Sequence, residues 1–151
     1  MMDPSGRKID VLVSEVGPRD GLQSINRTMP TEAKLHWIKA LAASGLREIE
    51  VGSFVSPRLL PQMVDCATLV REANKLHGLT VLALVPNLKG AQNAIAAATR
   101  KLTMPISASR AHSLNNIGKT PKEAIEEVRR VCAFRDSLPV EQRPDIEVGI
   151  S

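Results

Sequence analysis

Aromatic residues are scarce in this chain, which has one Trp, two Phe and no Tyr among 151 residues. A hydrophobic core must therefore be built from aliphatic side chains and Met. The scarcity also removes the aromatic platform on which many proteins stack unpaired nucleic-acid bases. The net charge is +4, but Lys and Arg are scattered along the chain. We therefore expect no nucleic-acid partner, and the positive balance at most favours an anionic small molecule.

Cysteines and long apolar runs are also few. Cys66 and Cys132 lie far apart and form no Cys-x-x-Cys pair, so the sequence indicates neither a zinc site nor redox chemistry. No apolar run approaches the ~18 residues of a membrane span, and residues 1–10 lack the apolar core of a signal peptide. These absences predict a cytoplasmic protein without a membrane partner.

Short β-branched runs alternate with segments of helical periodicity along the whole chain. The pattern predicts strands at residues 9–16, 48–51, 80–85, 102–106 and 146–150. It predicts helices at residues 31–45, 65–76 and 91–98, with a further helix beginning at residue 120. Residues 107–119 are polar and are expected to form a solvated loop.

Two of these helices have recognisable start signals. Thr31 follows a proline and is expected to cap the first helix, for which Gly45 is a plausible end. The last helix has the stronger signal, since Thr120 precedes Pro121 and stands three residues before Glu123. That spacing is typical of a capping box with proline in the first helical position.

The element order βαβαβαβαβ predicts an α/β fold with a parallel sheet covered by helices. A doubly wound nucleotide-binding fold usually has Gly-x-Gly-x-x-Gly after its first strand, whereas residues 17–21 read Gly-Pro-Arg-Asp-Gly. A TIM (β/α)8 barrel fits better but needs about 250 residues. We therefore predict the N-terminal part of such a barrel, with about four βα units and the start of a fifth strand. This incomplete domain would span residues 9–151 after a tail of residues 1–8.

Charged residues cluster where the first two predicted strands end. Glu15, Arg19 and Asp20 follow the first strand, and Glu50 lies at the end of the second. Parallel strands of a barrel end on one face, so these side chains should converge there. Carboxylates suit Mg²⁺ or Mn²⁺, and an arginine can stabilise a forming enolate. The spacing alone equally allows a purely structural ion pair of Arg19 with Glu50 or Asp20.

Four motifs occur in order along the chain: Glu-Val-Gly-Pro-Arg-Asp-Gly-Leu-Gln at 15–23, Ser-Phe-Val-Ser-Pro at 53–57, Pro-Gln-Met at 61–63 and Pro-Asn-Leu-Lys-Gly at 86–90. Together they resemble the 3-hydroxy-3-methylglutaryl-CoA lyases. These belong to the metal-dependent lyase and aldolase barrels named for an Asp-Arg-Glu signature. The resemblance runs from about Val11 to the chain end. It implies cleavage of this acyl-CoA to acetyl-CoA and acetoacetate, a step of leucine breakdown and ketone body formation.

The resemblance also implies roles for individual residues. Asp20 matches the aspartate that binds the divalent metal, Mg²⁺ or Mn²⁺. Arg19 matches the catalytic arginine that binds the substrate carbonyl and stabilises the enolate, and Glu50 matches the glutamate that supports this site. Gln23 is expected to line the substrate pocket. Ser53 and Asn87 stand at matching motif positions, for which either a site role or a loop-shaping role is open, whereas Pro57, Pro61 and Gly90 are expected to shape the backbone.

The family's remaining catalytic parts have no counterpart here. These are a His-x-His metal pair, an asparagine ligand and a cysteine on a glycine-rich loop, whereas His36, His77 and His112 stand apart from one another. One aspartate cannot hold Mg²⁺ firmly by itself. We therefore expect the isolated chain to be inactive and to need a missing C-terminal half or a second copy.

Several alternatives stay open from the sequence. Arg110 stands where the family usually has an acidic residue. With His112 it either meets an anionic part of the acyl-CoA, marks a subfamily with a different acyl-CoA substrate, or belongs to a solvated loop. A Claisen-type acyl-CoA synthase of the same superfamily is the alternative enzyme, although its usual Asp-Thr-Thr-Leu-Arg-Asp-Gly opening is absent. A non-catalytic half-barrel is the alternative outside catalysis.

Overall fold

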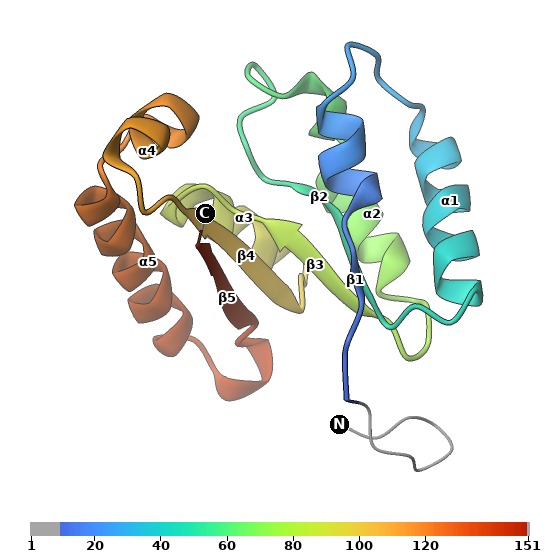
Figure 1. Cartoon of the computed structure of the whole chain (residues 1–151). Coiled ribbons are helices and arrows are strands. Elements are labelled where there is room, and N and C mark those ends of the chain that lie inside the picture. Colours follow the sequence, from blue (N-terminus) through green and yellow to red (C-terminus); the bar gives the residue numbers. More distant parts are fainter. Residues whose placement is uncertain (1–9, 151) are drawn as a thin grey trace.

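A computed structural model describes residues 10–150. Its centre is one sheet of five parallel strands, paired in the same order as they occur in the chain (Figure 1). The strands are β1 (Ser14–Glu15), β2 (Glu48–Ser53), β3 (Thr80–Leu84), β4 (Lys101–Ile106) and β5 (Asp145–Ile150). The predicted tail, residues 1–8, lies outside the described residues.

Helices connect successive strands and follow the outside of the curved sheet (Figure 1). They are α1 (Thr31–Ala43), α2 (Cys66–Ala73), α3 (Leu88–Ala96), α4 (Arg110–Ile117) and α5 (Pro121–Asp136). Three short turns complete the order: η1 (Gly17–Gly21), η2 (Pro61–Met63) and η3 (Val140–Gln142). Among residues 10–150, no helix has the length and apolarity that a membrane crossing would need.

The two faces of the sheet have opposite character because strand residues alternate between them. On the outer face, Ile49 and Val81 are fully buried in a core with α1 and α2, and Leu102 is buried in a second core with α3 and α5. The inner face carries charge instead. There the Lys101 ammonium lies 3.1 Å from the Glu48 carboxylate. This is the face that a closed barrel would enclose.

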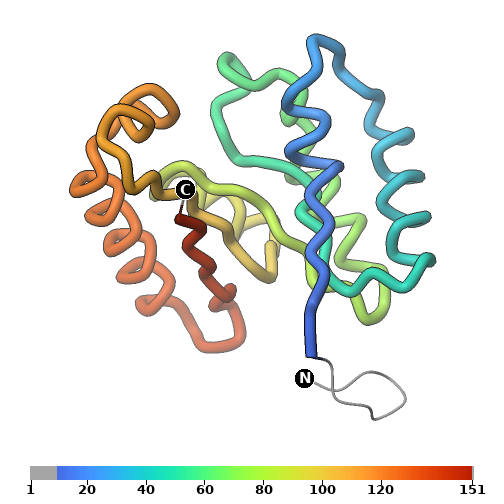
Figure 2. The backbone as a smooth tube through the Cα atoms, viewed as in Figure 1, coloured from blue at the N-terminus to red at the C-terminus, as the bar shows by residue number. Residues whose placement is uncertain are grey.

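The strand order confirms the predicted architecture. Neighbouring strands follow the chain from β1 to β5 without reversal, as in a barrel, whereas a doubly wound sheet reverses direction at a switch point. The chain therefore forms half of a TIM barrel, with four βα units and a fifth strand. The tube view shows η1, residues 54–62 and α4 at the same end of the sheet (Figure 2). The site lies at that end.

Two sequence predictions of secondary structure were wrong. The first strand was expected at residues 9–16 but comprises only Ser14–Glu15, because only these two residues pair with β2. Val11 and Val13 are exposed. Ile9 lies outside the described residues. The expected loop at 107–119 contains α4, which begins after a cap at Ser109. A short, polar helix of this kind shows little apolar periodicity, so the pattern could not reveal it.

The helix ends were predicted with mixed success. Thr31 does not cap α1: it is the first helical residue, and its hydroxyl donates to Asp65 Oδ2 at 2.8 Å. The prediction failed because this hydroxyl is used to join α1 to the segment before α2. The capping box of α5 is present as predicted, with Thr120 and Glu123 each accepting the other's backbone N–H.

Candidate active site at the carboxyl ends of the strands

The site begins with η1, a short π-helical turn that follows β1 after one residue. The backbone N–H groups of Arg19 and Asp20 both donate to the Val16 carbonyl, at 3.0 and 2.7 Å. The Glu15 carboxylate accepts the Gly17 N–H at 2.6 Å. A Cβ at Gly17 would lie 2.8 Å from that carboxylate oxygen, so only glycine fits without a shift. Glu15 therefore fixes the turn that carries Arg19 and Asp20.

Arg19 is held by a buried carboxylate on the neighbouring strand. Its Nε donates to Glu50 Oε2 at 2.5 Å, and the Arg19 and Glu50 side chains are 17% and 2% exposed. The other oxygen of Glu50 accepts a hydrogen bond from the Thr103 hydroxyl on β4. Both oxygens of this buried carboxylate are therefore satisfied, as a buried charge requires. The guanidinium keeps further N–H groups for a ligand.

Asp20 lies at the mouth of the site, with its side chain 59% exposed. Its Oδ1 accepts a hydrogen bond from Arg19 Nη1 at 2.8 Å. Within residues 10–150, no group of three His, Cys, Asp or Glu side chains is arranged to hold a metal ion. Mg²⁺ needs near-octahedral oxygen coordination, which one carboxylate does not provide. The described residues therefore do not form a complete metal site.

A cavity of about 750 Å³ opens beside these residues. Arg19, Asp20 and Gln23 all line it, so three of the four predicted site residues are brought together. Glu50 is not among the lining residues, because it lies beneath Arg19. The rest of the wall is mixed apolar and polar: Val55, Ser56, Leu59, Leu60, Leu84, Pro86, Asn87, Pro105, Asn116, Ile117, Gly118 and Lys119.

Several other predicted positions shape the backbone around the cavity. Asn87 is the N-cap of α3, and its Oδ1 accepts the Gly90 N–H at 2.9 Å. A Cβ at Gly90 would lie 2.8 Å from Pro86 and 3.1 Å from the Phe54 carbonyl, so the close approach requires glycine. Ser53 is 1% exposed, and its hydroxyl accepts the Val55 N–H at 3.3 Å. The loop-shaping interpretation fits each of these contacts.

Arg110 and His112 are both exposed on α4, and neither lines the cavity. A different cation does so. Lys119 stands between α4 and α5, and sequence reasoning missed it because it belonged to the segment expected to be a loop. The sequence does show that Lys119 directly precedes Thr120, which begins the helix with the clearest start signal. A residue next to such a helix start has a well-defined backbone position, and this could have marked Lys119 as a candidate.

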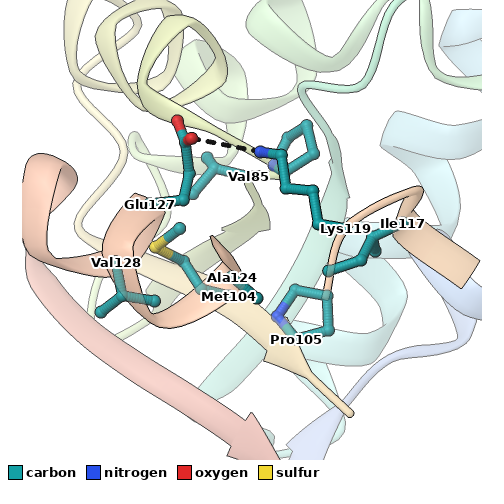
Figure 3. A pocket seen from close by; sticks show the side chains of 9 residues that line it. Val85, Met104, Pro105, Ile117, Lys119, Ala124, Glu127 and Val128 are labelled. Carbon is teal, nitrogen blue, oxygen red and sulfur yellow. Dashed lines mark hydrogen bonds and ion pairs between the residues drawn. The ribbon is translucent and has the colours of Figure 1, made fainter. Parts of the chain in front are cut away.

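Lys119 is joined to Glu127 of α5 in a second, small pocket that both residues line (Figure 3). Its Nζ lies 3.1 Å from Glu127 Oε2, while Glu127 Oε1 accepts the Leu88 N–H of α3 at 2.8 Å. Partial burial opposes ionisation of Glu127. The Leu88 N–H and the Lys119 ammonium outweigh it and hold the pKa of this carboxyl below its usual range. Glu127 is therefore ionised at neutral pH and links α3, α5 and the segment after α4.

Neither cysteine belongs to the site. Cys66 is buried in α2 against Gly52, and burial raises the pKa of its thiol. The thiol is therefore protonated at neutral pH and is a poor nucleophile. Cys132 lies in α5, half-buried. Neither residue lines the cavity.

Comparisons with known proteins give a consistent result. A family model described as HMGL-like matches residues 10–148. The mitochondrial hydroxymethylglutaryl-CoA lyase of Gallus gallus is 42% identical over 132 residues, which cover 86% of this chain and 44% of the relative. Sequence similarity therefore extends over most of the chain.

Solved structures are similar over the same extent. The HMG-CoA lyase of Bacillus subtilis gives a TM-score of 0.84 at 32% identity and covers 93% of this chain and 46% of that structure. The HMG-CoA lyase of Acinetobacter baumannii, solved with coenzyme A and 3-methylmalate, gives 0.83 at 30% identity and covers 92% and 44%. The chain thus spans less than half the length of each protein named here.

Proposed function

Because the chain belongs to the HMGL-like family, we propose that it supplies the N-terminal half of a carbon–carbon lyase acting on 3-hydroxy-3-methylglutaryl-CoA. The products would be acetyl-CoA and acetoacetate, as in leucine breakdown. The observation that carries this proposal is the placement of Arg19. Its guanidinium is fixed by Glu50 and lines a cavity that Asp20 and Gln23 also line.

The reaction needs stabilisation of an enolate. When the C3 hydroxyl loses its proton, its electrons form the acetoacetate carbonyl and the C2–C3 bond breaks. The released electron pair resides on the thioester as an enolate, which then takes up a proton to give acetyl-CoA. A fixed guanidinium beside the thioester oxygen stabilises that negative charge more than the neutral starting carbonyl. We assign this role to Arg19, with Glu50 positioning it and Gln23 contacting the substrate.

We further propose that Asp20 is one ligand of a divalent metal, Mg²⁺ or Mn²⁺. Its exposed carboxylate at the cavity mouth is suited to this chemistry. The other ligands must come from outside the described residues, since these contain no three-residue group that could hold the ion. The 151-residue polypeptide alone should therefore show no lyase activity with either metal, and turnover above background would contradict this.

A chimera tests the proposed activity directly. Residues 10–148 would replace the corresponding part of the Bacillus subtilis lyase, and acetoacetate release from 3-hydroxy-3-methylglutaryl-CoA would be measured. We expect turnover by the chimera and a loss of about 100-fold or more in R19Q, the size reported for removing an oxyanion donor. A folded but inactive chimera, or an R19Q variant with full activity, would contradict the proposal.

The alternatives make different predictions. A Claisen-type synthase would consume acetyl-CoA in the presence of a 2-oxo acid, so the same chimera should be assayed in that direction. A non-catalytic half-barrel would leave the chimera folded and inactive in both assays. A cytoplasmic location also stays a prediction, which cell fractionation would test; the chicken relative is named as mitochondrial.

A further inference from the structure

Lys119 is a cation in the cavity wall that the proposed mechanism does not use. We propose that Lys119 binds an anionic oxygen group of the ligand, either the carboxylate of the acyl part or a phosphate of coenzyme A. The inference rests on the proposed function, because it assumes an acyl-CoA ligand. It makes Lys119 a substrate-binding residue that acts together with Arg19 in the same cavity.

The backbone at Lys119 is fixed on both sides. Gly118 ends α4 in the left-handed region, with φ of 66°, and the fully buried Ser113 donates its hydroxyl to the Lys119 carbonyl at 2.6 Å. On the other side, Thr120 begins α5 with its capping box. Lys119 is therefore held between two helices, unlike a lysine on a loose surface loop.

Lys119 lines the cavity, and its ammonium is held at one side of it by the ion pair with Glu127. Figure 3 shows this ion pair in a second, small pocket that both residues line. The Lys119 side chain is 30% exposed and that of Glu127 is 12% exposed, so the ammonium is partly desolvated but still accessible to a ligand.

The partners of Glu127 leave Lys119 available for an anion. Arg19 is assigned to the thioester oxygen, so a separate anionic group of the ligand needs another cation. Glu127 has other partners besides Lys119. Arg130 Nη1 lies 3.6 Å from its Oε2, and the Leu88 N–H occupies its Oε1. Lys119 can therefore turn toward a ligand without leaving Glu127 unpaired.

The test compares ligand binding by the intact chain and two variants of the ion pair. K119Q removes the cation, whereas E127Q breaks the same ion pair but keeps Lys119 and an acceptor for the Leu88 N–H. The matched control is K75Q, which breaks the 2.7 Å surface pair of Lys75 with Glu72 away from the cavity. Titration calorimetry would measure the affinity of each for 3-hydroxy-3-methylglutaryl-CoA, butyryl-CoA and free coenzyme A.

We expect K119Q to weaken binding of the first thioester about tenfold, the usual size for one charge-assisted hydrogen bond. E127Q should bind as well as the unchanged chain or more tightly, and K75Q and K119R should bind normally. A loss confined to the carboxylate-bearing thioester identifies the acyl carboxylate as the anion. An equal loss for all three ligands identifies a phosphate of coenzyme A.

Three results would overturn the inference. If K119Q binds every ligand normally, Lys119 is not a binding residue although the proposed function stands. If E127Q weakens binding as much as K119Q, the ion pair has only a structural role. If the unchanged chain binds none of the ligands, this inference fails for the chain, whereas turnover by the chimera would still support the proposed function, so the two failures are distinguishable.

Discussion

At the scale of single residues, the central feature is a buried carboxylate with two hydrogen-bond donors. Glu50 is 2% exposed and accepts hydrogen bonds from Arg19 on one oxygen and Thr103 on the other. The sequence placed Arg19 and Glu50 at one site but left open whether Arg19 pairs with Glu50 or Asp20 and whether such a pair is only structural. The structure shows a pair that also presents the guanidinium to a cavity. Thr103 was not foreseen, because pairing across β2, β3 and β4 is needed to bring it there.

Replacing Thr103 by valine should destabilise the fold, since the isosteric change leaves one oxygen of the buried Glu50 carboxylate without a donor. An unsatisfied buried acceptor of this kind costs about 1–3 kcal/mol. Urea unfolding of T103V would measure the decrease in unfolding free energy. T103S retains the hydroxyl and should recover most of it. Equal stability of T103V and the unchanged chain would show that the Thr103 hydrogen bond contributes little.

At the scale of elements, the sequence predicted strands β2 to β5 and the start of α5 well. These segments have strong local signals: β-branched runs that end at turns, and a capping box. It failed where tertiary contacts decide the outcome. The first strand is limited by its short pairing with β2, and the Thr31 hydroxyl bonds to Asp65, which is distant in sequence. The helix α4 and the cavity position of Lys119 had no periodic pattern to reveal them.

The junction of α3 and α5 should give stability that depends on pH. The pKa of Glu127 is lower in the folded chain than in the unfolded chain, where it is about 4.3. Ionised Glu127 therefore stabilises the fold fully above the unfolded-state pKa, and this stabilisation is lost as the pH falls through the folded-state pKa. E127Q lacks this contribution at every pH. We therefore expect a smaller loss of unfolding free energy in E127Q than in the unchanged chain when urea unfolding is compared at about pH 7 and about pH 3.5.

A matched control separates the junction from ordinary surface charge. Glu72 also has a lowered pKa, held down chiefly by its hydrogen bond to Lys75, but its side chain is 38% exposed, against 12% for Glu127. Exposed pairs contribute little to stability because water screens them. E72Q should thus keep nearly the whole acid sensitivity of the unchanged chain. If E72Q and E127Q changed the pH profile equally, the junction would have no special role.

At the scale of the whole molecule, the half-barrel has an apolar outer core, a charged inner face and two outermost strands. β1 and β5 each pair with one neighbour in the described sheet. The inner face holds Lys101 between Glu48 and Glu147, whose hydrogen bonds and charges raise the pKa of the ammonium against the opposing effect of burial. Such a face resists collapse onto itself, so the free strand edges are the surfaces through which chains can associate.

Self-association of the 151-residue polypeptide should therefore depend on β5. Ile150 is 77% exposed on this outermost strand, and Val140 is 74% exposed in η3 away from any strand. A lysine at an exposed edge disfavours pairing between strands of different molecules. I150K should lower the mass measured by light scattering at high protein concentration, whereas V140K, an equally exposed change, should leave it unchanged. Equal effects of the two substitutions would mean that general surface hydrophobicity drives association and that the strand edge does not.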